Sequence, residues 1–264
     1  VMIGFNALGQ LGRLGNQMFQ FAALKGIARN RGFEYCFPPT QNKNEWTDHQ
    51  LLNPFKLACT SELNIQIIDI DRPIVMEETF SFSEKLFNQC PDWVSIQGYF
   101  QTEKYFKHIR DELLKDFEFR DEILEPCNEM MSQFDTPPVS LHIRRTDYLT
   151  NPNHTALGLD YYEEALKQFD DREVLVFSDD PEWCNQQELF SDDRFLIAEG
   201  NTNYIDLCLM TLCSGHIIAN SSFSWWGAWL SNSKKVVAPS GWFRESDNEH
   251  LDTKDIIPEI WNVL

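Results

Sequence analysis

Short apolar runs alternate with amphipathic stretches along the second half of the chain. An alternation of apolar and polar residues predicts a strand at residues 139–143, and short apolar runs predict strands at residues 173–177, 194–197, 216–219 and 235–238. Between them, apolar side chains spaced three or four apart predict helices at residues 158–169, 181–190, 204–213 and 223–230. Strands that alternate regularly with helices form parallel sheets covered on both faces, so we predict an α/β, Rossmann-like domain here.

The first half opens with a similar pattern. Residues 1–5 predict a short buried strand, a glycine-rich run follows, and from Met18 to Arg31 the apolar positions have helical spacing. A strand is expected at 94–100 and a helix from Thr102. The acidic stretch 118–129, broken by Pro126, and the proline-containing run 134–138 indicate a link. We therefore predict two domains, residues 1–135 and residues 136–264.

Charged side chains gather where the strand at 139–143 ends. Arg144 and Arg145 follow it directly, and Asp147 is close enough to orient one of them. Ligands of open α/β sheets bind at the carboxyl ends of the strands, and the guanidinium fork suits phosphate oxygens. The pattern indicates a clamp for a diphosphate. The alternative is a solvated basic strand end in a surface salt bridge.

The glycine-rich run Gly9-Gln10-Leu11-Gly12-Arg13-Leu14-Gly15-Asn16-Gln17 lies between a predicted strand and a predicted helix. Such a junction presents backbone N–H groups and the positive end of the helix dipole, so Gly15 and Asn16 are candidates for binding an anion. The run contains neither G-K-[ST] nor G-x-G-x-x-G, which argues against NTP hydrolysis and dinucleotide binding. It could also be only a tight turn that requires glycine.

Two further strand ends carry polar groups. Asp179 follows the strand at 173–177, and a carboxylate there could accept two hydrogen bonds from guanine; Asp180 could instead cap the next helix. The strand at 216–219 leads into a turn whose N–H and hydroxyl groups would point at an anion: Asn220, Ser221, Ser222 and Phe223. The tryptophans behind this turn are expected in the core: Trp225, Trp226 and Trp229.

Composition narrows the classes of protein. The 264 residues include 22 Lys and Arg against 41 Asp and Glu, a formal charge of −19, which argues against nucleic acid as a partner. The seven cysteines never form a C-x-x-C pair, so neither zinc nor a disulfide framework is indicated. No apolar run approaches the ~18 residues of a membrane span, and the first residues lack a signal peptide, so we expect a cytoplasmic protein without a transmembrane segment.

Asp69-Ile70-Asp71 is a D-x-D sequence, the acidic pair with which many nucleotide-sugar transferases hold a divalent metal. The isoleucines around it favour instead an ordinary strand that runs into a turn at Pro73. Metal-dependent transfer through Asp69 and Asp71 therefore remains an alternative.

The run LHIRRTDY resembles the H-x-R-R-x-D-Y signature of the α-1,2-fucosyltransferase family. The resemblance continues through GRLGNQMFQ, GYFQTEKYF, VFSDDPEW and HIIANSSFSWWGAWL, which together span nearly the whole chain. It implies a GT-B architecture of two facing Rossmann-like domains and an inverting, metal-independent transfer of L-fucose. The donor would be GDP-fucose, the acceptor the 2-hydroxyl of a galactose-terminated glycan, and no cofactor would be needed. The first domain would be the acceptor side and the second would bind the donor.

The resemblance also implies roles for single residues. Arg144 and Arg145 would contact the diphosphate, His142 would lie near the ribose or guanine, and Asp179 would contact guanine. The turn residues Ser221, Ser222 and Phe223, with Asn220, would hold the β-phosphate. Gly15 and Asn16 would approach the phosphates or the fucose from the other domain, so that Asn16 and Arg144 would contribute to catalysis.

The sequence leaves the general base open. Asp147 is the candidate within the signature, although its spacing also suits it to orient an arginine, and His154 and Asp160 follow shortly after. Besides the metal-dependent alternative, a non-catalytic guanine-nucleotide-binding protein remains possible, and the sequence does not identify the acceptor.

Overall fold

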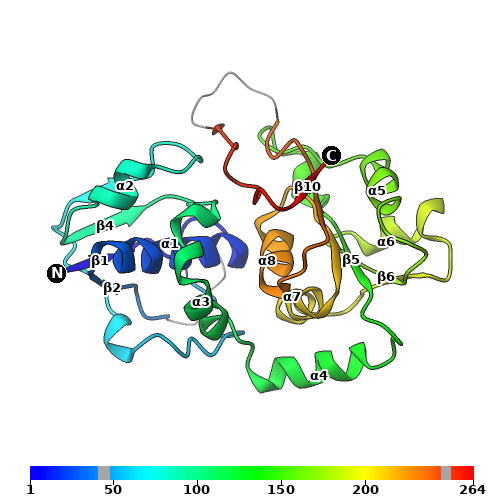
Figure 1. Ribbon diagram of the computed structural model, residues 1–264, viewed down its shortest axis with the longest axis horizontal. Helices are drawn as coiled ribbons and strands as arrows, with labels where there is room; N and C mark the ends of the chain where they lie inside the picture. Colours follow the sequence, from blue (N-terminus) through cyan, green and yellow to red (C-terminus); the bar gives the residue numbers. More distant parts are fainter. Residues whose placement is uncertain (41–47, 245–250) are drawn as a thin grey trace. The chain divides into compact units, whose positions relative to one another are not determined.

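The computed structural model describes residues 1–40, 48–244 and 251–264 (Figure 1). The chain divides into two compact units. The first contains Val1–Arg120 with Asp247–Pro258, and the second contains Asp121–Ser246 with Glu259–Leu264.

The first unit is built on a four-stranded parallel sheet in the order β2-β1-β4-β3. Its strands are β1 (Met2–Gly4), β2 (Glu34–Cys36), β3 (Ile74–Met76) and β4 (Val94–Gln97). Its helices are α1 (Leu14–Arg31), α2 (Glu84–Gln89) and α3 (Arg110–Asp116). Helix α1 begins four residues before Met18, so the last four residues of the glycine-rich run form its first turn, and most of the helix is buried. The run therefore meets the helix N-terminus directly.

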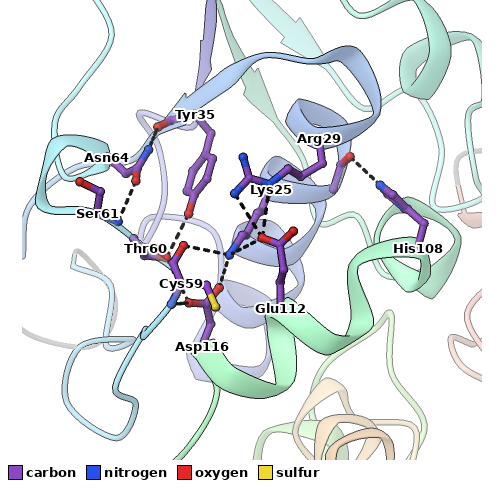
Figure 2. A network of polar contacts seen from close by, with 11 residues as sticks. Lys25, Arg29, Tyr35, Cys59, Thr60, Ser61, Asn64, His108, Glu112 and Asp116 are labelled. Atoms are coloured by element: carbon purple, nitrogen blue, oxygen red, sulfur yellow. Dashed lines mark hydrogen bonds and ion pairs between the residues drawn. The ribbon is translucent and has the colours of Figure 1, made fainter.

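An ion pair buried inside the first unit joins α1 to α3 (Figure 2). Lys25 and Asp116 are fully buried, and their charged atoms lie 2.5 Å apart. Asp116 also accepts the backbone N–H of Cys59 at 2.7 Å, and Glu112 lies 3.3 Å from the Lys25 ammonium. Buried charges persist only when they are paired and hydrogen-bonded. This network connects two helices to the segment that follows residue 57.

The second unit contains a six-stranded parallel sheet in the order β10-β9-β8-β5-β6-β7. The strands are β5 (Val139–Ile143), β6 (Val174–Ser178), β7 (Phe195–Ile197), β8 (Gly215–Ile217), β9 (Val236–Ala238) and β10 (Asn262–Val263). The helices are α4 (Asp121–Met131), α5 (Leu159–Leu166), α6 (Pro181–Asn185), α7 (Asn203–Leu212) and α8 (Ser222–Ser231). Every strand predicted in this half is present, and the predicted α/β class is confirmed. The tryptophans of α8 lie in the core, also as predicted: Trp225, Trp226 and Trp229.

The units separate at Arg120 and Asp121 rather than at residue 135. The acidic stretch with Pro126 forms α4, which packs against α7 and so belongs to the second unit. Near the other end of the chain, Asp255 accepts the Lys104 ammonium at 2.5 Å and the Phe82 N–H at 2.9 Å. Through these contacts a segment near the C-terminus belongs to the first unit. A single boundary along the sequence therefore cannot describe the two units.

Two local predictions were wrong. Residues 65–70, expected as a strand, form no strand, and two of their four isoleucines, Ile67 and Ile70, are exposed. Strand β4 ends at Gln97 rather than at Phe100, and Phe100 has φ 55°, outside the range of an extended strand.

Candidate active site

Arg144 stands at the carboxyl end of β5, the strand flanked by β6 and β8. Its guanidinium contacts two carboxylates, Asp179 at 2.9 Å and Asp147 at 2.5 Å. The side chain is mostly buried, and its guanidinium lies over the ring of Tyr148, 5.4 Å from the centroid. These contacts on several sides hold the guanidinium at the sheet edge where ligands of this fold class bind.

Arg145 is held by a different set of contacts. Its Nε donates to Asp180 at 3.2 Å, and its guanidinium lies 3.8 Å from the centroid of the Trp183 ring. Asp180 also caps α6 by accepting the Trp183 N–H at 3.3 Å, as one of the alternatives for this residue predicted. The α6 turn therefore supplies both the carboxylate and the aromatic face that orient Arg145.

Asp179 links the two arginines. One of its oxygens accepts the backbone N–H of Arg145 at 2.9 Å, and the other contacts the Arg144 guanidinium and accepts the Thr146 hydroxyl. Both oxygens are thus engaged by the segment 144–146. The contact between Asp179 and guanine stays a prediction, and the observed bonds make Asp179 an anchor for the arginines.

His142 lies within β5 and is buried. Its Nδ1 forms a hydrogen bond of 2.8 Å with the Ser224 hydroxyl, and its ring lies 5.8 Å from that of Phe223. Burial, assisted by the nearby Arg144 charge, lowers the pKa of His142 to about 3, so the imidazole is neutral near pH 7. His142 thereby joins β5 to the first turn of α8, while its proximity to ribose or guanine stays a prediction.

The turn before α8 is fixed from several directions. The Ser221 hydroxyl caps the helix by accepting the Phe223 N–H at 3.3 Å, and Ser222 is the first helical residue. Asn220 is buried, and its Nδ2 donates to the carbonyls of Thr155 at 3.1 Å and Trp242 at 3.0 Å. Asn220 therefore ties two neighbouring loops to the end of β8.

In the first unit, Asn16 lies in the first turn of α1, one residue after Gly15. Its Oδ1 accepts the side-chain amide of Gln101 at 2.8 Å. Gly12 has φ +90°, and a Cβ there would lie 2.1 Å from the Asn16 Nδ2. Glycine is therefore required at position 12 both for the backbone and for the placement of the Asn16 side chain.

The candidate residues fall into two groups. Arg144, Arg145, Asp147 and Asp179 form one contact network in the second unit. Gly15 and Asn16 belong to the first unit. That the two groups act on one donor stays a prediction.

Comparison with known proteins identifies the family. Residues 2–264 match the model of "Glycosyl transferase family 11". The chain belongs to this family. The O-antigen biosynthesis glycosyltransferase WbnK of Escherichia coli is 29% identical over 288 residues, covering 91% of this chain and 95% of that protein. An alpha-1,2-colitosyltransferase of Escherichia coli is 36% identical over 204 residues, covering 70% and 67%. Human galactoside alpha-(1,2)-fucosyltransferase 1 is 25% identical over 271 residues, covering 91% and 68%.

Solved structures show the fold of this family 11 chain. Fucosyltransferase NodZ from Bradyrhizobium superposes with a TM-score of 0.58 at 12% identity, covering 89% of this chain and 93% of that one. POFUT1 in complex with GDP gives 0.56 at 12% identity, covering 90% and 98%. Both have the GT-B fold, so the predicted GT-B class is confirmed.

Several residues of the candidate site escaped the sequence analysis. Thr146, Trp183 and Gln101 each contact a predicted residue, but nothing in their spacing predicts those contacts. His154 was named only as a candidate base, and its ring stacks on Tyr148 with centroids 4.3 Å apart. Burial lowers the pKa of His154.

Asp69 and Asp71 lie in an exposed turn, where the Asp71 N–H donates to the Asp69 carboxylate at 3.2 Å. Across the described ranges, no three or more His, Cys, Asp or Glu side chains gather closely enough to hold a metal ion.

The part of the chain that the structure describes contains no helix with the length and apolar character that a membrane crossing requires.

Proposed function

We propose that this chain is an inverting α-1,2-fucosyltransferase that moves L-fucose from GDP-fucose to the 2-hydroxyl of a galactose-terminated glycan. The observation that carries the proposal is that Arg144 and Arg145, at the end of β5, are held in place by contacts with Asp179 and Trp183. Membership of family 11 and the similarity to galactoside alpha-(1,2)-fucosyltransferase 1 support the choice of fucose and of the linkage.

The chemistry of the leaving group matches the paired arginines. When the bond between the sugar and GDP breaks, negative charge grows on the β-phosphate, and donors that are already oriented stabilise it most. Asp179 and Asp147 hold Arg144, while Asp180 and Trp183 hold Arg145. We propose that these guanidiniums, with the turn 220–223, perform this task without a metal ion or another cofactor.

In the proposed reaction, the acceptor hydroxyl attacks the anomeric carbon of fucose on the face opposite GDP, which inverts the configuration. The bond from the anomeric carbon to the β-phosphate oxygen breaks, and the hydroxyl proton passes to a base. Asp147 bonds to Arg144, which supports its role in orienting that arginine. Asn16 would supply a side-chain donor to the phosphate or the departing sugar from the first unit, beside Gly15, and we propose this unit as the acceptor side.

A second donor sugar is supported by one observation, the 36% identity to an alpha-1,2-colitosyltransferase. Colitose lacks one hydroxyl that fucose carries. A site that hydrogen-bonds this hydroxyl discriminates strongly against the sugar without it, whereas a site that leaves it exposed accepts both.

A competition assay separates these proposals. The protein is incubated with a terminal galactoside and equal amounts of GDP-fucose and GDP-colitose, and the products are resolved by mass. The fucosyl product should predominate. A predominant colitosyl product would move the donor assignment to colitose, and GDP binding without any transfer would favour a non-catalytic nucleotide-binding protein.

A further inference from the structure

A carboxylate at the end of β3 holds the loop that follows β4. The two strands pair in parallel, and the Glu77 N–H donates to the Gln97 carbonyl at 2.8 Å. The Glu77 carboxylate in turn accepts the N–H of Tyr99 at 2.7 Å and the N–H of Phe100 at 3.0 Å. One side chain therefore fixes two consecutive peptide groups of the loop 98–101.

This loop has a conformation that needs such support. Phe100 is a buried, non-glycine residue with φ 55°, in the left-handed region that ordinary side chains disfavour. At Gly98, a Cβ would lie 2.4 Å from the Cβ of Glu77, so the loop and the Glu77 side chain pack without room for another atom. Burial raises the pKa of Glu77 to about 7, which agrees with a carboxyl group enclosed by the loop it supports.

The same loop is linked to the glycine-rich run in two ways, once directly and once through Gln20. Gln101 donates its side-chain amide to the Asn16 Oδ1 at 2.8 Å. Gln20 donates to the Gly98 carbonyl at 3.2 Å and to the Leu11 carbonyl at 2.9 Å, and so bridges the two segments. Because the Asn16 Oδ1 is engaged by Gln101, the side-chain amide is oriented with its Nδ2 as the donor end, which is the end that an anion requires.

We propose that Glu77 is a positioning residue for Asn16: it fixes the loop 98–101, the loop fixes Gln101, and Gln101 orients the Asn16 amide. The inference rests on the proposed function, in which Asn16 donates to the phosphate or the departing sugar. In this proposal Glu77 contacts neither the donor nor the acceptor and acts only through the loop.

Kinetics of a double-mutant cycle test this chain of contacts. Glu77→Ala should lower kcat by about tenfold or more, because small displacements of a positioned donor are costly. Its affinity for GDP, measured by calorimetry, should stay within about twofold, since the arginines belong to the other unit. In an Asn16→Ala background, Glu77→Ala should cost less than about threefold, because the group it positions is already absent. Equal losses in both backgrounds would overturn the proposal.

Glu77→Gln provides the same cycle if the alanine variant fails to fold. The amide keeps one acceptor oxygen but turns an NH₂ group toward a peptide N–H, so a smaller loss with the same dependence on Asn16 is expected. Glu84→Gln is the matched control, because Glu84 is an exposed carboxylate in the first turn of α2 in the same unit. It should behave as the wild type.

Hydrogen exchange distinguishes failure of this inference from failure of the proposed function. In Glu77→Gln, peptides covering residues 98–102 and residues 10–17 should both exchange several-fold faster than in Glu84→Gln. Unchanged exchange at 10–17 would refute the link to Asn16 whatever the enzyme's donor. If the wild type transfers no sugar from GDP-fucose while both segments respond, the proposed function fails and the structural link stands.

Discussion

At the scale of single residues, Arg145 makes two contacts that a lysine cannot reproduce together. Its planar guanidinium lies on the Trp183 ring while Nε bonds to Asp180. Arg145→Lys keeps the charge but loses this geometry, so kcat/KM should fall by about 10- to 100-fold while the melting temperature changes little. Steady-state kinetics and thermal unfolding measure both quantities.

Arg194→Lys is the control for this prediction. Arg194 immediately precedes β7, so it lies at the amino ends of the parallel strands, away from the proposed site. Its replacement should leave kinetics unchanged. Wild-type turnover in Arg145→Lys would contradict phosphate binding by this arginine and would favour the alternative of a surface salt bridge.

Glu77 gives a prediction for stability against pH. Its pKa of about 7 in the folded protein lies above the ordinary 4.5, so the folded state holds the proton more tightly than the unfolded chain. The free energy of unfolding should therefore fall as pH rises from about 5 to about 8, and Glu77→Gln should lack this part of the decrease. Burial also raises the pKa of neighbouring Tyr105, which keeps that residue neutral over this range.

Urea unfolding of the two proteins at both pH values measures the effect. The free energy of unfolding of Glu77→Gln, relative to that of the wild type, should be higher at about pH 8 than at about pH 5. A difference that does not depend on pH would mean that the carboxyl group titrates as an exposed one.

The sequence predicted the functional residues at strand ends better than the residues that hold functional side chains in place. Arg144 and Arg145 follow from a period-two run that stops at two charges. Trp183 could not be placed beneath Arg145, because that contact depends on how α6 folds back toward the end of β5. Glu77 was overlooked for the same reason, since its partners lie in a loop more than twenty residues away.

At the scale of elements, the attachment of α1 to α3 depends on a buried ion pair (Figure 2). Lys25→Met leaves the Asp116 carboxylate buried without its cation, so the free energy of unfolding should fall by about 3–5 kcal/mol. Denaturant titration measures this loss. Replacing both partners, in Lys25→Met with Asp116→Leu, should recover part of it.

Lys56→Met is the matched control, because Lys56 pairs with Glu118 where both side chains are partly exposed, by 35% and 51%. Its loss should cost less than about 1 kcal/mol. Similar losses from Lys25→Met and Lys56→Met would show that burial does not govern the strength of these pairs.

Elements with strong local periodicity were predicted well, and those stabilised by distant partners were not. β5 follows from an alternation of apolar and polar residues, and β6 follows from an uninterrupted apolar run. β10 is two exposed residues that form a strand because β9 lies beside them. The isoleucines at 65–70 have strand propensity, but only Ile65 pairs, in a single parallel bridge with Phe37, and Ile67 and Ile70 are exposed.

At the scale of the whole molecule, the net charge of −19 makes nucleotide binding depend on a local cluster of arginines. GDP should raise the melting temperature, and UDP at the same concentration should do so far less if the second unit recognises guanine. A ligand present at about 100 times its dissociation constant stabilises the folded state by about 2.7 kcal/mol. Equal stabilisation by GDP and UDP would contradict recognition of guanine.

The GT-B class could be predicted because motifs along nearly the whole chain resemble one family. The alternation of strands and helices by itself predicted a Rossmann-like domain only in the second half. The division of the chain could be predicted only in part. A helix packs with the unit that offers it an apolar partner, and the contact between α4 and α7 arises between segments about eighty residues apart.

The central claim is metal-independent transfer of fucose from GDP-fucose to the 2-hydroxyl of a terminal galactoside. Its most direct test is to incubate the protein with these substrates in excess EDTA and to determine the linkage and anomeric configuration of the product by NMR. We predict an α-1,2-linked fucoside formed at the same rate with and without EDTA. No product from GDP-fucose, a different linkage, or activity that returns only when manganese is added would contradict the account.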